Sequence, residues 1–199
     1  MNMTRRVLLL DLGGVLADLG DPVTSMGLDM TPTEFWKTWT SSAVVRALET
    51  GQMDETEFLR EIPAVLGCSD STPFADRFHA WQLTLFPGVV EIVGNAATDY
   101  RVALLSNTNE IHWQQVTAAS RVFDEFEHVF LSYKTGHYKP EPAAFHDVTE
   151  FFDCAPGDVV FLDDSKPNVA AARDLGIDAR LVAGVSELEQ QLLRVADRA

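Results

Sequence analysis

Short apolar runs recur along the chain, and in its second half they alternate with longer stretches of helical periodicity. The runs are too short for helices and have the composition of buried strands. They cover residues 7–10, 102–105, 129–131, 159–162 and 179–182. The helical patterns cover residues 110–123, 142–152 and 167–175. Strands that alternate with helices of this length indicate βαβ units, so the pattern predicts an α/β fold with a doubly wound parallel sheet.

The interval between the first two predicted strands has helical patterning and little strand signal. Thr31-Pro32-Thr33-Glu34 has the form of a capping box with proline at the first helical position, and Asp54 to Glu57 repeats the capping pattern. A third helix is predicted over residues 74–85. We therefore expect a core domain of residues 1–18 and 87–199, with residues 19–86 inserted as a helical domain over the carboxyl ends of the strands.

Composition narrows the possible functions. The 199 residues are 46% hydrophobic, which is typical of a globular protein, and the formal net charge is -15. Such an acidic chain is a poor partner for nucleic acid or an anionic membrane surface. Cys68 and Cys154 form no metal-ligand spacing, and neither an export signal nor a membrane span is evident. These features predict a cytoplasmic protein, and they leave a monomer and a homodimer both open.

Polar residues follow the predicted strands where each strand ends. Asp11 follows the first strand and precedes Gly13-Gly14, and Ser106-Asn107 ends the second. A hydroxyl and an amide beside a helix N-terminus can hold a phosphate oxygen. Taken singly, each motif also fits an ordinary turn or a helix cap.

Two further motifs carry charge. Lys139 precedes Pro140, which favours an extended conformation at Lys139 and so fixes the direction of a loop ammonium. Asp163-Asp164 directly follows the fourth strand, where two adjacent carboxylates are costly unless a cation lies between them. Carboxylate oxygens are the ligands that Mg2+ prefers. A helix N-cap would require only one of the two acids.

The carboxyl ends of parallel strands meet at one edge of the sheet, so these four motifs should converge. A carboxylate nucleophile, a divalent cation, a hydroxyl and an ammonium together make a phosphoryl-transfer site, with Asp11 attacking phosphorus. A receiver-type signalling domain has a similar set of residues. In such a domain, however, the paired acids come early and the lysine last, so that interpretation is rejected.

With these four motifs in this order, the chain resembles the haloacid dehalogenase (HAD) superfamily over essentially its whole length. Asp11 in DLGGVL, Ser106 in LLSNTN, Lys139 in YKPEPAAF and Asp163-Asp164 in VFLDDSKPNVAAARDLGI match its successive motifs. The resemblance implies a Rossmann-like sheet with a small helical cap. Within the superfamily the chain is most similar to bacterial sugar phosphatases of the α-D-glucose-1-phosphate phosphatase type.

The same resemblance implies roles for single residues. Mg2+ would be held by the Asp11 carboxylate, the Gly13 carbonyl and Asp164, while Asp163 would be the partner of Lys139. Phosphate would be bound by Ser106, Asn107 and Lys139. The expected reaction is hydrolysis of a small phosphorylated metabolite through an aspartyl phosphate.

Gly13 departs from the family pattern. Phosphatases of this superfamily usually carry an Asp there as general acid and base, a role worth roughly 10²–10⁴-fold in rate. His137, Asp18 and Glu49 are candidate substitutes by position. A catalytically weakened phosphate-binding protein is therefore an alternative function, and a metal-independent carbon–halogen hydrolase is another.

Several aromatic and basic residues have two interpretations. His112-Trp113 follows the second motif and could line the site or simply pack at a helix start. Trp36, Trp39 and Trp81 could stack on a sugar ring or form the core of the helical insertion. Arg46 could contact an anionic group of the substrate or remain at the surface.

Overall fold

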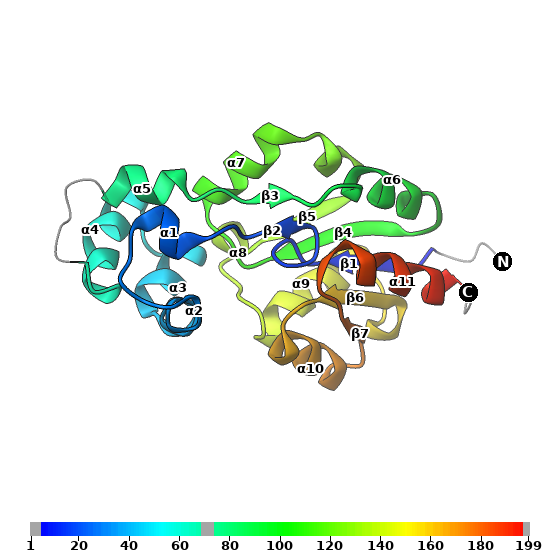
Figure 1. The fold of residues 1–199 in the computed structure, drawn as a ribbon. Coiled ribbons are helices and arrows are strands. Elements are labelled where there is room, and N and C mark those ends of the chain that lie inside the picture. The colour runs from blue at the N-terminus through cyan, green and yellow to red at the C-terminus, as the bar shows by residue number, and fades with distance from the viewer. Residues whose placement is uncertain (1–4, 69–73, 197–199) are drawn as a thin grey trace.

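Five parallel strands form the central sheet, in the order β5-β4-β1-β6-β7, in a computed structural model that describes residues 5–68 and 74–196 (Figure 1). The strands are β1 (Val7–Leu10), β4 (Arg101–Ser106), β5 (His128–Leu131), β6 (Val159–Asp163) and β7 (Asp178–Leu181). Every strand pair in this sheet is parallel. The predicted α/β fold is confirmed, and each predicted strand lies within one residue of an observed one.

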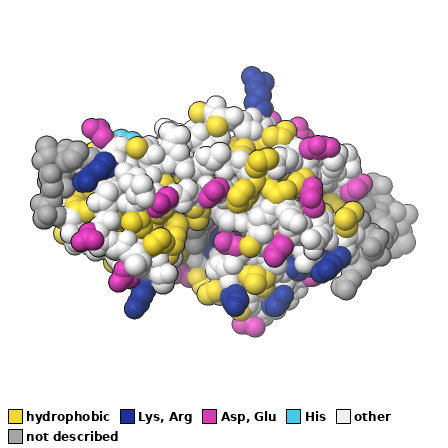
Figure 2. Space-filling model, in the orientation of Figure 1, with side chains coloured by type: hydrophobic (Ala, Val, Ile, Leu, Met, Phe, Trp, Pro, Cys, Tyr) yellow, Lys and Arg dark blue, Asp and Glu magenta, His cyan; other side chains and the backbone are white. Residues whose placement is uncertain are grey.

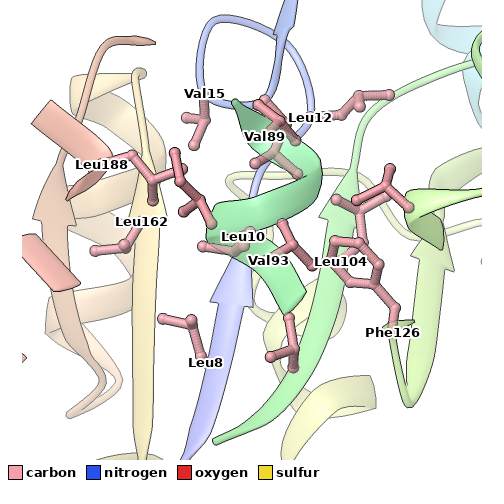
Figure 3. Close-up of a cluster of buried hydrophobic side chains, with 14 of the residues drawn as sticks. Leu8, Leu10, Leu12, Val15, Val89, Val93, Leu104, Phe126, Leu162 and Leu188 are labelled. Carbon is pink, nitrogen blue, oxygen red and sulfur yellow. The ribbon is translucent and has the colours of Figure 1, made fainter. Parts of the chain in front are cut away.

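The central strand β1 is buried on both faces of the sheet. Leu8 and Leu10 point into one hydrophobic cluster, and Val7 and Leu9 belong to the other. Figure 3 shows Leu8 and Leu10 beside the side chains of α6 and of the neighbouring strands. A strand covered on both faces explains why its sequence is continuously apolar rather than alternating.

Helices cover both faces of the sheet. The first cluster takes side chains from α6 (Val89–Asp99), α7 (Glu110–Ala119) and α11 (Gly184–Ala196). The second takes them from α9 (Pro142–Phe152) and α10 (Lys166–Asp174). Three short elements complete the core: the single turn α8 (Ser132–Thr135) and the 3₁₀ helices η1 (Val122–Glu125) and η2 (Pro156–Asp158).

The predicted helix over residues 110–123 is shorter in the structure. Helix α7 ends at Ala119, and Ser120 adopts an extended conformation. The Ser120 hydroxyl accepts a hydrogen bond from the Val122 amide at 3.1 Å, so the chain turns into η1 instead of continuing the helix. A side chain that bonds a nearby backbone amide competes with helix formation, which is the physical reason for the early end.

The helical insertion, defined here as α1–α5, has a hydrophobic cluster of its own. Its helices are α1 (Pro22–Met26), α2 (Pro32–Ser41), α3 (Ala43–Glu49), α4 (Glu55–Val65) and α5 (Phe74–Ala80). Both predicted caps are present: Thr31 and Glu34 form a capping box, and Asp54 accepts from the Glu57 amide at 2.8 Å. The cluster is built largely from aromatic rings, Phe35, Trp39 and Phe58 among them. The bounds 19–86 for a separate domain stay a prediction.

The prediction of one helix over residues 74–85 is wrong. Helix α5 ends at Ala80, and β3 (Thr84–Leu85) pairs antiparallel with β2 (Ala17–Asp18). Apolar residues at positions 74, 78, 81 and 85 have helical spacing, which is why the sequence suggested a longer helix. The pairing with β2, distant in sequence, decides the conformation at the end of this stretch.

Within the described residues, no helix is long and apolar enough to cross a membrane. Cys68 and Cys154 are both free. Figure 2 shows acidic side chains scattered over the helical insertion and the core on the face in view, with no basic stripe across that face.

Candidate active site

A cavity of about 840 Å³ lies at the carboxyl ends of the strands and is also lined by the helical insertion. The core contributes the loops after β1, β4, β5 and β6. The core residues include Asp11, Gly13, Gly14, Ser106, Asn107, His112, Tyr138, Lys139 and Asp164. The insertion contributes Trp36, Trp39, Thr40 and Glu49. The loops that carry the four motifs therefore meet at one cavity, as their positions at the strand ends predicted.

Asp11 and Lys139 form an ion pair at the centre of this site. The Lys139 ammonium donates to Asp11 Oδ1 at 2.7 Å, to Asp163 Oδ2 at 2.7 Å and to the Leu105 carbonyl at 2.8 Å. Lys139 is only 2% exposed, and its three donors are all used. The ammonium is therefore fixed in position against the carboxylate that we predicted as the nucleophile.

Asp163 is completely buried and fully occupied by protein donors. Besides Lys139, its carboxylate accepts from the Asn168 side chain at 3.0 and 3.1 Å and from the Ser165 amide at 2.8 Å. Asn168 was not singled out from the sequence, although its place as the third residue of α10, shortly after the acidic motif, could have suggested it. Asp163 is thus built to hold Lys139 rather than to reach into the cavity.

Burial and repulsion from neighbouring carboxylates raise the pKa of Asp11 and of Asp164. Burial raises the pKa of Asp11 to about 7, with Lys139 acting in the opposite direction and Asp163 adding to the rise. Burial and the neighbouring Asp163 raise the pKa of Asp164. Burial lowers the pKa of Lys139, but Asp11 and Asp163 outweigh it, so the pKa lies above its usual value. The single positive charge of Lys139 does not balance the negative charge that three ionised carboxylates would carry.

The three acids are arranged as a possible cation site. Asp11, Asp163 and Asp164 each place a carboxylate oxygen within 4.8 Å of the others. Oxygen donors and surplus negative charge fit a hard divalent cation such as Mg2+. Because the Asp163 oxygens are occupied by protein donors, Asp11 and Asp164 are the side chains that fit such an ion best.

Ser106 and Asn107 reach the site but are used differently. Ser106 ends β4, is buried and lines the cavity, and phosphate binding by its hydroxyl stays a prediction. The Asn107 side chain instead donates to the Lys139 carbonyl at 2.9 Å and accepts from the Lys139 amide at 2.8 Å. The side chain of Asn107 thus ties the loop of Lys139 to the end of β4, and phosphate binding by Asn107 stays a prediction.

The two glycines after Asp11 are constrained to different degrees. Gly14 has φ +72°, and a Cβ atom there would lie 2.1 Å from Asp164 Oδ2. At Gly13 a Cβ atom would meet Leu19 Cδ2 at 2.9 Å, which is the movable tip of a side chain. Gly14 therefore lets the first loop pass directly against the Asp164 carboxylate, whereas Gly13 tolerates a side chain if Leu19 shifts.

Glu49 is the carboxyl group that the helical insertion brings to the cavity. It is the last residue of α3, is 6% exposed, and interacts with the Tyr138 hydroxyl and the Trp39 indole. Burial raises the pKa of Glu49 to about 7, against the effect of these two contacts. Tyr138 was not singled out from the sequence, although it directly precedes Lys139.

The other candidate substitutes for the acid at Gly13 lie in different places. Asp18 lines the cavity, is exposed, and accepts a hydrogen bond from the Gly20 amide at 2.9 Å. His137 does not line this cavity; its Nδ1 lies 2.7 Å from Asp147. The structure therefore brings Asp18 and Glu49, but not His137, to the site.

For the tryptophans, His112 and Arg46, the sequence left open whether each lines the site or packs elsewhere, and the structure places each of them. Trp39 and Trp81 line the cavity and belong to the core of the insertion at the same time. His112 lines the cavity and packs against Trp81 with a centroid distance of 4.5 Å. Arg46 is not in the cavity; it forms an ion pair with Glu141 and lies over the Tyr138 ring.

Comparison with known proteins gives a consistent picture. The family model of haloacid dehalogenase-like hydrolases matches residues 6–176. The chain is 24% identical over 200 residues to D-ribitol-5-phosphate phosphatase of Bacteroides thetaiotaomicron, a match that covers 93% of this chain and 95% of that protein.

Solved structures agree in fold. A HAD family enzyme from Bacteroides thetaiotaomicron, crystallised with magnesium and inorganic phosphate, superposes with a TM-score of 0.73 at 29% identity, covering 89% of this chain and 93% of the other. A HAD-like hydrolase from Porphyromonas gingivalis reaches a TM-score of 0.78 at 21% identity, covering 97% and 98% of the two chains. At that identity the second match shows a shared fold alone.

Proposed function

The chain belongs to the haloacid dehalogenase-like hydrolases, and on that basis we propose that it is a Mg2+-dependent phosphatase acting on a small phosphorylated metabolite, a sugar or polyol phosphate. The observation that carries the proposal is the Asp11 carboxylate, which meets the Lys139 ammonium at 2.7 Å in a cavity at the strand ends. The residue roles below are part of the proposal.

Asp11 is the nucleophile. Lys139 engages Oδ1, so we assign Oδ2 to attack on phosphorus. Asp11 Oδ2 forms a bond to phosphorus while the bond from phosphorus to the ester oxygen breaks. The ester oxygen keeps the electron pair, takes a proton from water and leaves as the alcohol, and an aspartyl phosphate remains. Water then attacks the same phosphorus and releases phosphate and free Asp11.

Charge at the transferring group is balanced from two sides. Lys139 places a fixed positive charge beside Asp11, and the Ser106 hydroxyl offers a donor from the end of β4. Asp163 and Asn168 keep Lys139 in that position. Because these groups are already oriented, little reorganisation is needed when negative charge shifts during the reaction.

The carboxylates of Asp11 and Asp164 and the Gly13 carbonyl would hold the Mg2+ ion. When bound, such an ion supplies positive charge to the phosphoryl oxygens. The surplus of carboxylates over ammonium groups at this site supports the assignment. Gly14 permits the close approach of the first loop to Asp164.

The substrate class rests on the relatives. One is named for the hydrolysis of D-ribitol 5-phosphate, and another was crystallised with magnesium and phosphate. A cavity of about 840 Å³ has room for a carbon skeleton besides the phosphate group. Residence in the cytoplasm and a monomeric or homodimeric state stay predictions.

The test is phosphate release from a panel of sugar and polyol phosphates, with and without Mg2+. Wild type should hydrolyse at least one member, and Asp11→Asn should lower kcat on the order of 10⁴-fold or more, because the amide cannot serve as the nucleophile. No release from any member, with Asp11→Asn indistinguishable from wild type, would contradict the proposal. Loss of activity on adding EDTA would exclude the metal-independent carbon–halogen hydrolase.

A binding or regulatory protein on the same scaffold is the second candidate, because Gly13 has no side chain to move a proton. This candidate predicts binding of Mg2+ and phosphate without turnover. Gly13→Asp tests it directly, with Gly13→Ala as the steric control because both variants displace Leu19. A gain in turnover with Asp but not with Ala identifies the missing acid as limiting.

A further inference from the structure

The walls of the cavity differ in chemistry. The core side carries Asp11, Ser106 and Lys139, which suit a phosphate group and its metal ion. The insertion side carries the rings of Trp36 and Trp39 and the carboxyl group of Glu49. An aromatic surface with a carboxyl beside it suits the carbon skeleton of a polyhydroxylated compound, whose C–H groups pack on rings and whose hydroxyls need partners.

Glu49 has hydrogen-bonding capacity beyond its contacts with protein. A carboxylate offers about four lone-pair sites, while Tyr138 and Trp39 are the two side chains that interact with it. Because burial raises the pKa of Glu49 to about 7, part of the population is protonated at neutral pH and can also donate. A partly protonated group repels a phosphate dianion less than a fully ionised one.

The other titratable groups in the same part of the cavity are less suited. Asp18 is exposed and holds the Gly20 amide. Nδ1 of His112 is bonded to Asn109 at 3.1 Å, and its Nε2 is buried, without a hydrogen-bond partner among the described residues, in a ring that packs edge-on against Trp81. Glu49 is therefore the buried carboxyl group that this wall offers to a hydroxyl.

We propose that Glu49 binds a hydroxyl group on the carbon skeleton of the phosphorylated substrate, and that this contact selects polyhydroxylated phosphates over alkyl phosphates of the same length. The inference rests on the proposed function, because it assumes that the phosphate group lies at Asp11. A site built to hydrogen-bond a hydroxyl discriminates strongly against the analogue that lacks it, since its buried polar group is then left unpaired.

The experiment compares two pairs of substrates of equal carbon number. They are D-ribitol 5-phosphate with n-pentyl phosphate, and glycerol 3-phosphate with n-propyl phosphate. The pair to be analysed is the one whose polyol phosphate wild type hydrolyses faster. Glu49→Ala should lower kcat/KM for that polyol phosphate by about 10- to 100-fold and should change kcat/KM for the matching alkyl phosphate by less than about twofold. Glu49→Gln, which keeps the shape and most of the bonding capacity, should lie between Glu49→Ala and wild type. Glu57→Gln, at an exposed position of the insertion, is the matched control and should change neither value.

A parallel fall for both members of a pair would assign Glu49 a structural role and overturn the inference, and so would no fall at all. Should Glu49→Ala fail to fold, the same comparison is made with Glu49→Gln, for which the loss must again be confined to the polyol phosphate.

A second measurement separates this inference from the proposed function. Trp36, Trp39 and Trp81 line the cavity, so their fluorescence reports binding of D-ribitol 5-phosphate in EDTA without turnover. Glu49→Ala should weaken that binding by a similar factor, and equal affinity would overturn the inference. If wild type releases phosphate from no compound but this difference in binding is seen, the proposed function fails and the role of Glu49 stands.

Discussion

The strand-end loops of the core and the helical insertion meet at the same cavity, but they contribute different kinds of group. On the core side Lys139 and Asp163 use all their bonding capacity on protein partners: Lys139 alone bonds Asp11, Asp163 and the Leu105 carbonyl. On the insertion side aromatic rings dominate, and Glu49 is a carboxyl with two side-chain contacts.

This difference predicts that the two sides of the cavity respond differently to substitution. The core cluster is costly to alter because its charges are buried and depend on one another. The insertion has a separate hydrophobic cluster, so residues on its cavity side can change without disturbing the sheet. We therefore expect substitutions in the core to affect chemistry and stability together, and substitutions in the insertion to separate the two.

The largest stability effect should come from Lys139→Met. Loss of the ammonium leaves Asp11 and Asp163 as buried carboxylates without a cation, and breaking a buried pair in this way typically costs about 3–5 kcal/mol. Urea unfolding followed by circular dichroism at neutral pH measures the change. Lys134→Met, in the same segment but exposed, is the control and should stay near wild type. Equal stability of the two variants would contradict the prediction that the buried ion pairs of Lys139 stabilise the core.

The next effect concerns Glu49→Gln and depends on pH. The pKa of Glu49 is raised from 4.5 to about 7 in the folded protein, so the folded state binds this proton more tightly than the unfolded state does. Wild-type stability therefore falls as pH rises from about 4.5 through 7, and each tenfold difference in proton affinity between the two states corresponds to about 1.4 kcal/mol.

At pH 8 Glu49→Gln should consequently be more stable than wild type by up to about 3 kcal/mol, and below pH 4.5 the gain should vanish. The groups that face Glu49 are Trp39 of α2 and Tyr138 of the core, with Arg46 over the Tyr138 ring. Urea unfolding across pH 4–8 measures the difference, with Glu57→Gln alongside. A gain that is independent of pH would show that the proton on Glu49 is not its cause.

Gly14→Ala should be the larger of two neighbouring glycine effects. At φ +72° a side chain costs about 1–2 kcal/mol in backbone strain, and the new Cβ would also displace Asp164. Gly13→Ala meets only the tip of Leu19 and should cost less. Thermal unfolding gives the stabilities, and Mg2+ titration should show weaker binding for Gly14→Ala. The reverse order would contradict the role assigned to Gly14.

The smallest effect is expected for Asp54→Ala at the start of α4. It removes the cap on the Glu57 amide and should cost about 1 kcal/mol of stability. Because the substitution lies in the insertion and outside the cavity, kcat/KM should not change. Asp54→Ser, which can still cap, should recover the stability, and failure to recover would mean that the cap is not the source of the loss.

Much of this architecture could be predicted from local sequence. The strands were evident because they are buried on both faces and therefore continuously apolar, and the helix starts at Thr31 and Asp54 carry their own capping residues. The convergence of Asp11, Ser106, Lys139 and Asp163-Asp164 followed from strand direction alone.

Other features depended on contacts between distant segments. Strand β3 forms because it pairs with β2, which is distant in sequence. The apolar residues of the stretch 74–85 have a spacing that also fits a helix. The Asn107 side chain bonds the backbone amide and carbonyl of Lys139, 32 residues away, and no local pattern indicated that pairing. The sequence offered both His137 and Glu49 as candidate substitutes for the acid missing at Gly13 and did not distinguish between them. Glu49 lies in the cavity because the insertion packs against Tyr138 of the core.

Local sequence was therefore sufficient for the sheet, the order of its motifs and the kind of chemistry at their meeting point, because burial patterns and strand ends are properties of short segments. Long-range packing was needed to establish which acid faces the cavity from the insertion, which oxygens of Asp163 are already bonded, and why Gly14 admits no side chain. Those outcomes depend on distances between residues far apart in the chain, and no local pattern encodes such distances.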